Sequence, residues 1–125
     1  MLLTSFLCAA ALSPPLAGHW VLHLYIEDRL FDDTVDVVAA ADGTLGGTLV
    51  VPGRFTAALE HVQSDPVKRT VSFEIMADEG HGPFRVRYAG TMHGAHDTFV
   101  GFATEPGAAG AKDVLLGGFV AQRRP

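Results

Sequence analysis

The feature that most constrains this chain is an alternation of apolar and polar residues that begins at Trp20 and recurs almost to the C-terminus. It is clearest over residues 70–76, where Val71, Phe73 and Ile75 alternate with polar neighbours. Successive side chains of a β-strand point to opposite faces, so this period is typical of strands with one buried and one solvated face. The pattern therefore predicts an all-β domain.

Turn residues divide the alternating region into eight segments, and Asp42-Gly43 is the strongest hairpin signal among them. The predicted strands cover residues 20–26, 30–39, 45–51, 54–62, 70–76, 83–90, 98–102 and 114–123. Closing consecutive strands into an up-and-down barrel removes both exposed edges. The glycine pairs at 46–47 and 117–118 are typical of bulges or sharp bends within strands. We expect a small eight-stranded antiparallel β-barrel, with a two-sheet sandwich as the alternative.

Length and composition narrow the classes of protein and partner. A chain of 125 residues with 48% hydrophobic content has the size and composition of one globular domain. The formal net charge of −5 and the scattered basic residues disfavour nucleic acid as a partner, because phosphate binding needs clustered Lys and Arg. The single cysteine, Cys8, precedes the alternating region, so we expect no disulfide in the barrel.

Residues 1–17 form a separate, largely apolar leader that precedes the predicted barrel domain, residues 18–125. The apolar part has the length of a signal-peptide core and is too short to span a bilayer. We therefore expect an exported protein, periplasmic or secreted, with no membrane span in the mature chain. Cleavage after Ala11 satisfies the small-residue rule, whereas cleavage after Ala17 places Pro15 at the third position before the cut. A retained segment that plugs one end of the barrel is the alternative.

The most specific motif combines Gly18 and Trp20, at the start of the first predicted strand, with Arg123 or Arg124 at the end of the last. A Gly-x-Trp, seven further strands in sequence order and a terminal arginine together resemble the lipocalin (calycin-type) pattern. The short chain is similar to the small bacterial lipocalin-like domains. The resemblance implies that Gly18, Trp20 and Arg123 close one end of the barrel, with the guanidinium over the indole. The alternative is a tryptophan that is simply part of the core.

A barrel of this size is either filled by side chains or holds one small ligand. The alternation places Phe55, Phe73, Phe84 and Tyr88 on inner faces, where they would line an apolar ligand site. Two polar residues share the register of apolar ones and are the candidate polar anchors, namely Asp33 and His61. The alternative is that both face water, since unpaired buried charges are costly.

These observations favour non-enzymatic binding of a small, largely apolar molecule inside the barrel. Two alternatives stay open: a filled barrel that acts as a structural or protein-interaction module, and a small isomerase or cyclase that uses Asp33, His61 and Tyr88 as acid–base groups. The chain has no nucleophile-elbow motif, and we predict no cofactor. We also predict no metal site, because the His and acidic residues of loops 78–81 and 93–97 match no recognised ligand spacing.

Overall fold

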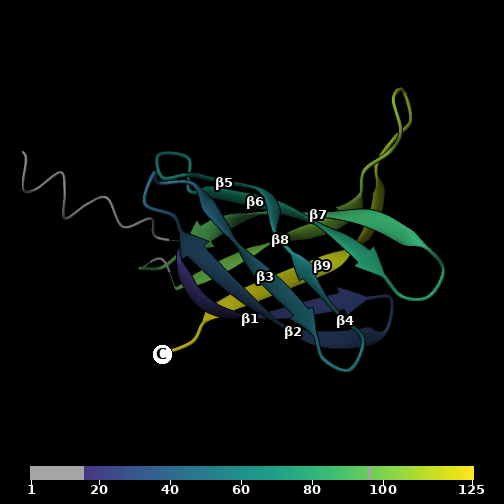
Figure 1. The fold of residues 1–125 in the computed structure, drawn as a ribbon, viewed down its shortest axis with the longest axis horizontal. Helices are drawn as coiled ribbons and strands as arrows, with labels where there is room; N and C mark the ends of the chain where they lie inside the picture. The colour runs from purple at the N-terminus through teal and green to yellow at the C-terminus, as the bar shows by residue number, and fades with distance from the viewer. Residues whose placement is uncertain (1–15, 96) are drawn as a thin grey trace, which may run out of the picture.

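The structure of the chain is a computed structural model that describes residues 16–95 and 97–125 (Figure 1). Its regular elements are nine β-strands. They are β1 (Gly18–Ile26), β2 (Arg29–Ala39), β3 (Leu45–Val51), β4 (Phe55–Ala58), β5 (Glu60–Asp65), β6 (Thr70–Asp78), β7 (Pro83–His93), β8 (Thr98–Glu105) and β9 (Val114–Arg123). The prediction of an all-β chain is confirmed for these residues.

The nine strands form one antiparallel sheet in the order β4-β3-β2-β1-β9-β8-β7-β6-β5, and the sheet curls into a nearly closed barrel (Figure 1). Every pairing joins strands that are neighbours in sequence except β1 with β9, which brings the first and last strands together. At the two edges of the sheet, β4 approaches β6 and β3 approaches β5. The up-and-down barrel architecture is therefore confirmed.

The predicted strand count of eight is wrong, because the predicted strand 54–62 is two strands. β4 pairs with β3, whereas β5 pairs with β6 on the other edge of the sheet. The break falls at Leu59, which is buried and whose amide donates a hydrogen bond to the Gly47 carbonyl. A register shift follows between Glu60 and Gln63, where His61 has a φ of 52°. The chain thus bends where it passes from one edge of the sheet to the other.

One apolar core runs through the interior of the barrel. The inward residues of each strand alternate with outward ones, as in β6, where Val71, Phe73 and Ile75 are buried. Aromatic rings fill much of this space, with Phe99 and Phe119 in edge-to-face contact at 5.7 Å between centroids. Burial of these rings and of the aliphatic residues around them is the main favourable contribution to folding.

The strand connections define two distinct ends of the barrel. The turns β1–β2, β3–β4, β6–β7 and β8–β9 lie at one end, which we call the open end. The turns β2–β3, β5–β6 and β7–β8 lie at the other end, together with the C-terminus (Figure 1). Leu16 lies at this end as well, because its carbonyl oxygen accepts a hydrogen bond from Trp20 near the start of β1. We call this second end the closed end, for the reason given below.

Candidate functional site

Trp20 fills the closed end of the barrel. Its side chain is completely buried, and its indole Nε1–H donates a hydrogen bond of 2.9 Å to the carbonyl oxygen of Leu16. Phe99 contacts the ring edge-on, with the centroids 4.8 Å apart. A buried indole needs an acceptor for its N–H, and the chain immediately before β1 supplies it. Residue 16 is therefore part of the folded barrel, with no exposed surface of its own.

Arg123 covers the outer face of Trp20. The guanidinium carbon lies 4.3 Å from the centroid of the indole, and Nη1 donates a 2.7 Å hydrogen bond to the Ala17 carbonyl. Gly18 leaves room for this arrangement, since a Cβ there would lie 2.5 Å from Nη1 of Arg123. Its φ of 135° is also one that residues with a side chain rarely adopt. Of the two arginines that the sequence left open, the structure places Arg123 over the ring, and Arg124 is exposed.

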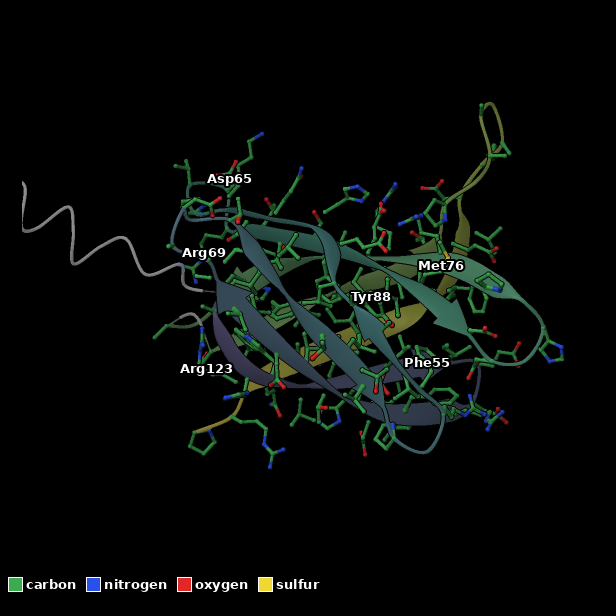
Figure 2. The ribbon with its side chains drawn as sticks, in the orientation of Figure 1. Phe55, Asp65, Arg69, Met76, Tyr88 and Arg123 are labelled. Carbon is green, nitrogen blue, oxygen red and sulfur yellow. The ribbon has the colours of Figure 1, made fainter. Side chains whose placement is uncertain are left out.

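The open end contains a pocket of about 70 Å³ that communicates with solvent. Phe31, Phe55 and Phe84 line it, and each is half-buried at the end of its strand. Figure 2 shows Phe55 and Tyr88 well separated from Arg123 along the barrel. Small-molecule pockets commonly have about 300–1,000 Å³. This pocket is therefore large enough for one small group of a ligand, and the rest of the molecule has to remain at the mouth.

Asp33 is the one buried charged residue among those that the structure describes. It follows the inward register of β2, its exposed fraction is 1%, and it lines the pocket. Its Oδ1 atom has no hydrogen-bond partner among the described residues. Burial, aided by the negative charges of Asp32 and Glu79 and opposed by Arg54, raises the pKa of Asp33 to about 6. An unsatisfied buried carboxylate is costly, so the pocket has a strong hydrogen-bond acceptor to offer a ligand.

Tyr88 forms part of the pocket wall next to the core. Its ring stacks on Phe73, with the centroids 4.9 Å apart and the planes inclined by 17°. Burial raises the pKa of the Tyr88 hydroxyl above its usual value, and the Asp33 and Glu79 carboxylates add to this effect. The hydroxyl is therefore a neutral group in the pocket. Phe73 itself is buried behind Tyr88 and does not line the pocket.

The rim of the pocket carries a charged pair that the alternating pattern of the sequence does not predict. Arg54, in the β3–β4 turn, donates a hydrogen bond to Glu79 in the β6–β7 turn. Arg54 also lies over the ring of Phe31, at 5.2 Å from its centroid, as does Arg29 at 5.3 Å. Both members of the pair sit in turns, outside the alternating pattern. The predicted topology could have indicated the pair, because the β3–β4 and β6–β7 turns lie at the same end of an up-and-down barrel.

His61 does not belong to this pocket, which corrects its prediction as an inward polar anchor. Its side chain is 69% exposed, and Nδ1 lies 3.0 Å from Oε1 of Glu74 on the outer face. The left-handed backbone of His61 and the adjacent bulge break the alternation that places Phe55 inward. The structure thus brings together Phe55, Phe84, Tyr88 and Asp33 but leaves out Phe73 and His61.

The outer face around Glu74 holds a network of ion pairs. Arg87 Nε donates to Glu74 Oε2 at 3.0 Å, and Arg85 Nη1 donates to Glu60 at 2.6 Å and to Glu74 at 3.2 Å. Burial alone would raise the pKa of Glu74, but the hydrogen bonds from His61 and Arg87 outweigh it and lower the pKa. All charges in this network have partners, so it contributes to cross-strand stability rather than forming an available site.

Neither of the loops with His and acidic residues assembles a metal site in the part of the chain described. Within residues 16–95 and 97–125, no group of three or more His, Cys, Asp or Glu side chains is close enough to hold an ion. His96 lies outside the described residues. The described residues also include no helix of the length and hydropathy needed to cross a membrane.

Fold and site together define a small antiparallel β-barrel that is closed by Trp20 and Arg123 at one end and has an acidic, aromatic pocket at the other. Comparisons of the chain with protein-family models, with curated proteins and with solved structures found no match. The function is therefore inferred from the chemistry of the pocket itself.

Proposed function

We propose that this protein binds a small, largely apolar molecule non-covalently, through a group that enters the pocket at the open end of the barrel. The observation that carries the proposal is the pocket of about 70 Å³ between the half-buried rings of Phe31, Phe55 and Phe84. Aromatic walls with few polar groups are typical of small-molecule sites. Filling this space would add packing contacts, so the fold leaves unused a stabilisation that a purely structural barrel could gain.

The two alternatives have less support. The filled-module hypothesis accounts for the closed half of the barrel, where Trp20 and Phe99 pack, but not for the pocket in the other half. The isomerase or cyclase hypothesis requires His61 within reach of Asp33 and Tyr88. Because His61 lies on the outer surface beside Glu74, that acid–base set is not assembled. Binding remains the function that the geometry favours.

A relationship to small lipocalin-like domains is part of the same proposal. Its support is the arrangement of Gly18, Trp20 and Arg123, in which the guanidinium covers the indole at the closed end and a glycine makes room for it. Export is also proposed, on the basis of the apolar leader. Cleavage after Ala11 is the preferred position, because cleavage after Ala17 would remove Leu16 and the carbonyl that Arg123 binds.

The proposal is tested by titrating the ¹⁵N-labelled protein with the neutral probes benzene and 1-butanol. We expect saturable amide shifts at the open end, at residues such as Phe55 and Phe84, and none at Trp20. Ala77 is buried, pairs with Phe84 and lines the pocket, so Ala77→Leu fills the space and should abolish the shifts. The matched control is Ala89→Leu, because Ala89 is exposed on the outer face of β7.

Two results would contradict the binding proposal. One is the absence of any saturable shift with either probe. The other is a response that is unchanged in Ala77→Leu, which would place the probes elsewhere on the surface. A response lost equally in Ala89→Leu would also count against it, since that substitution leaves the pocket intact.

A further inference from the structure

The pocket contains an acceptor that none of the described residues of the barrel satisfies. Asp33 is 1% exposed, lines the pocket, and has no hydrogen-bond partner for Oδ1 among the described residues. A buried carboxylate that lacks a partner costs free energy that a bound donor recovers. A cation with N–H donors recovers the most free energy, because hydrogen bonds between two charged groups are the strongest.

The charges around Asp33 point to the same kind of ligand. Asp32 from β2 and Glu79 from the β6–β7 turn add negative charge, and Tyr88 from β7 is neutral. Arg54, from the β3–β4 turn, is the positive group that acts on Asp33, and it is engaged with Glu79 at the rim. The facing residue of β1 is Leu22, which has no charge. Among the charged residues that line the pocket, Asp33 and Glu79 outnumber Arg54, and Arg29 lies outside this lining over the ring of Phe31. The lining therefore carries one net negative charge, which disfavours carboxylates and favours cations.

The walls and the volume restrict the cation further. Aromatic rings attract ammonium groups through their π faces, most strongly where water is excluded. Phe55, Phe84 and Tyr88 supply such rings within the same pocket as Asp33. A pocket of about 70 Å³ holds an ammonium group and a few carbons, but not a large ring system. The remainder of the ligand would extend past the half-buried phenylalanines at the mouth.

We propose that the ligands of this pocket are organic ammonium ions, bound with the –NH₃⁺ group on Asp33 and a short apolar body against Phe55, Phe84 and Tyr88. The inference rests on the proposed binding function and names the chemical class of its ligand. It assigns Asp33 as the residue that selects amines over alcohols and carboxylates of the same size.

The test compares butylammonium, 1-butanol and butanoate as probes of nearly equal size, with dissociation constants measured by amide-shift titration at pH 7.5. We expect butylammonium to bind at least about 10-fold more tightly than 1-butanol, and butanoate to bind most weakly. Asp33→Asn keeps the shape of the side chain. In this variant the affinity for butylammonium should fall at least about 10-fold, while the affinity for 1-butanol should change less than about 3-fold.

Asp32→Asn is the matched control. Asp32 is the neighbour of Asp33 on β2, but its side chain is 62% exposed and pairs with His23 on the outer face at 2.6 Å. The two variants remove the same charge from adjacent residues on opposite faces of the sheet. We expect Asp32→Asn to change the affinity for butylammonium less than about 3-fold, because charges in water are screened.

A measurement on the unaltered protein makes the test independent of whether Asp33→Asn folds. Because the pKa of Asp33 is about 6, its carboxylate is protonated at pH 5 while the alkylammonium stays charged. The affinity for butylammonium should fall about 10-fold between pH 7.5 and pH 5, and that for 1-butanol should not. Equal binding of 1-butanol and butylammonium, or tighter binding of butanoate, would overturn the amine assignment and leave the binding function standing. Failure of all three probes would overturn both.

Discussion

Asp32 and Asp33 show how completely the surroundings of a residue decide its chemistry. The two are adjacent on β2, yet one faces water beside His23 and the other faces the pocket. Burial first and neighbouring negative charge second raise the pKa of Asp33 to about 6. In an unfolded chain the Asp33 carboxyl would titrate near pH 4. The shift at Asp33 is therefore produced by folding, and a measurement of this shift reports on the folded pocket.

This shift predicts an unusual dependence of stability on pH. Between about pH 4 and 6 the folded state binds a proton at Asp33 that the unfolded state has already released, so raising the pH destabilises the fold across this window. The shift of the Asp33 pKa to about 6 corresponds to about 3 kcal/mol of folding stability that is lost by pH 7. Urea unfolding of the unaltered protein and of Asp33→Asn, at pH 4 and at pH 7.5, measures it.

We expect Asp33→Asn to be more stable than the unaltered protein by about 2–3 kcal/mol at pH 7.5, and the two to differ little at pH 4. The difference between the two proteins cancels the contributions of all other titrating groups. A constant difference across the pH range would show that the Asp33 carboxylate titrates as in water, which its buried position argues against.

At this scale the sequence was informative wherever a side chain lies on a regular strand. Alternation alone identified Phe55, Phe84 and Tyr88 as inward residues, and it drew attention to Asp33. The alternation failed for His61, because a residue with left-handed backbone at a bulge breaks the alternation of inward and outward side chains. It also gave no information on the Arg54–Glu79 pair, because turn residues have no periodic pattern to follow.

Among the elements, β3 shows how tightly neighbouring strands of this barrel approach each other. Gly47 pairs with Val37 on β2 and accepts a hydrogen bond from the Leu59 amide at the bend between β4 and β5. A Cβ on Gly47 would lie 1.8 Å from the backbone oxygen of Asp36, and its φ is 138°. β2, β3 and the bend between β4 and β5 therefore meet at a position that only glycine can occupy without movement of the backbone.

The glycine pair of β3 offers a matched comparison of two identical substitutions. Gly47→Ala should destabilise the protein by at least about 3 kcal/mol, because the clash is with backbone and the conformation is strained. Gly46→Ala should change stability by no more than about 1 kcal/mol, because a Cβ there meets no atom within 4 Å. Chemical denaturation of both variants checks this. Equal effects would mean that β3 does not approach β2 as closely as described.

The predicted and observed elements differ where the chain changes partners. The strands with clear alternation and a turn signal on each side, such as β6 and β7, were predicted within a few residues. The segment 54–62 was predicted as one strand because its pattern contains no Gly, Pro or charge cluster at Leu59. The break arises from barrel closure, in which the chain leaves β3 and reaches β6, and this is a property of the whole sheet.

At the scale of the whole molecule, the two ends of the barrel differ: one end is tightly packed, and the other holds the pocket for which we propose ligand binding. At the closed end the buried indole, the guanidinium and the preceding backbone satisfy one another. At the open end the Oδ1 atom of Asp33 has no hydrogen-bond partner within residues 16–95 and 97–125, and space remains unfilled. Unsatisfied buried groups reduce stability, so a well-packed closed end offsets what the pocket costs.

This difference between the two ends predicts where the folded molecule must begin. A chain that starts at Leu12, as after cleavage behind Ala11, should be as stable as the full chain. A chain that starts at Gly18 loses the buried Leu16 side chain and the acceptors of Trp20 and Arg123, and should lose at least about 3 kcal/mol. Urea unfolding followed by the fluorescence of Trp20 compares the two. Equal stability would mean that these contacts contribute little.

The separation of the ends has a practical consequence for how this protein can be handled. The C-terminal residue lies beside His19 and Trp20 at the closed end, at the far side of the barrel from the pocket mouth. A surface linker or affinity handle attached after Pro125 thus leaves the mouth directed away from the support. A dye intended to sense a ligand belongs instead on the turn at residues 79–82. Anchoring and the proposed ligand binding therefore do not compete for the same surface, which is the geometry that a biosensor component requires.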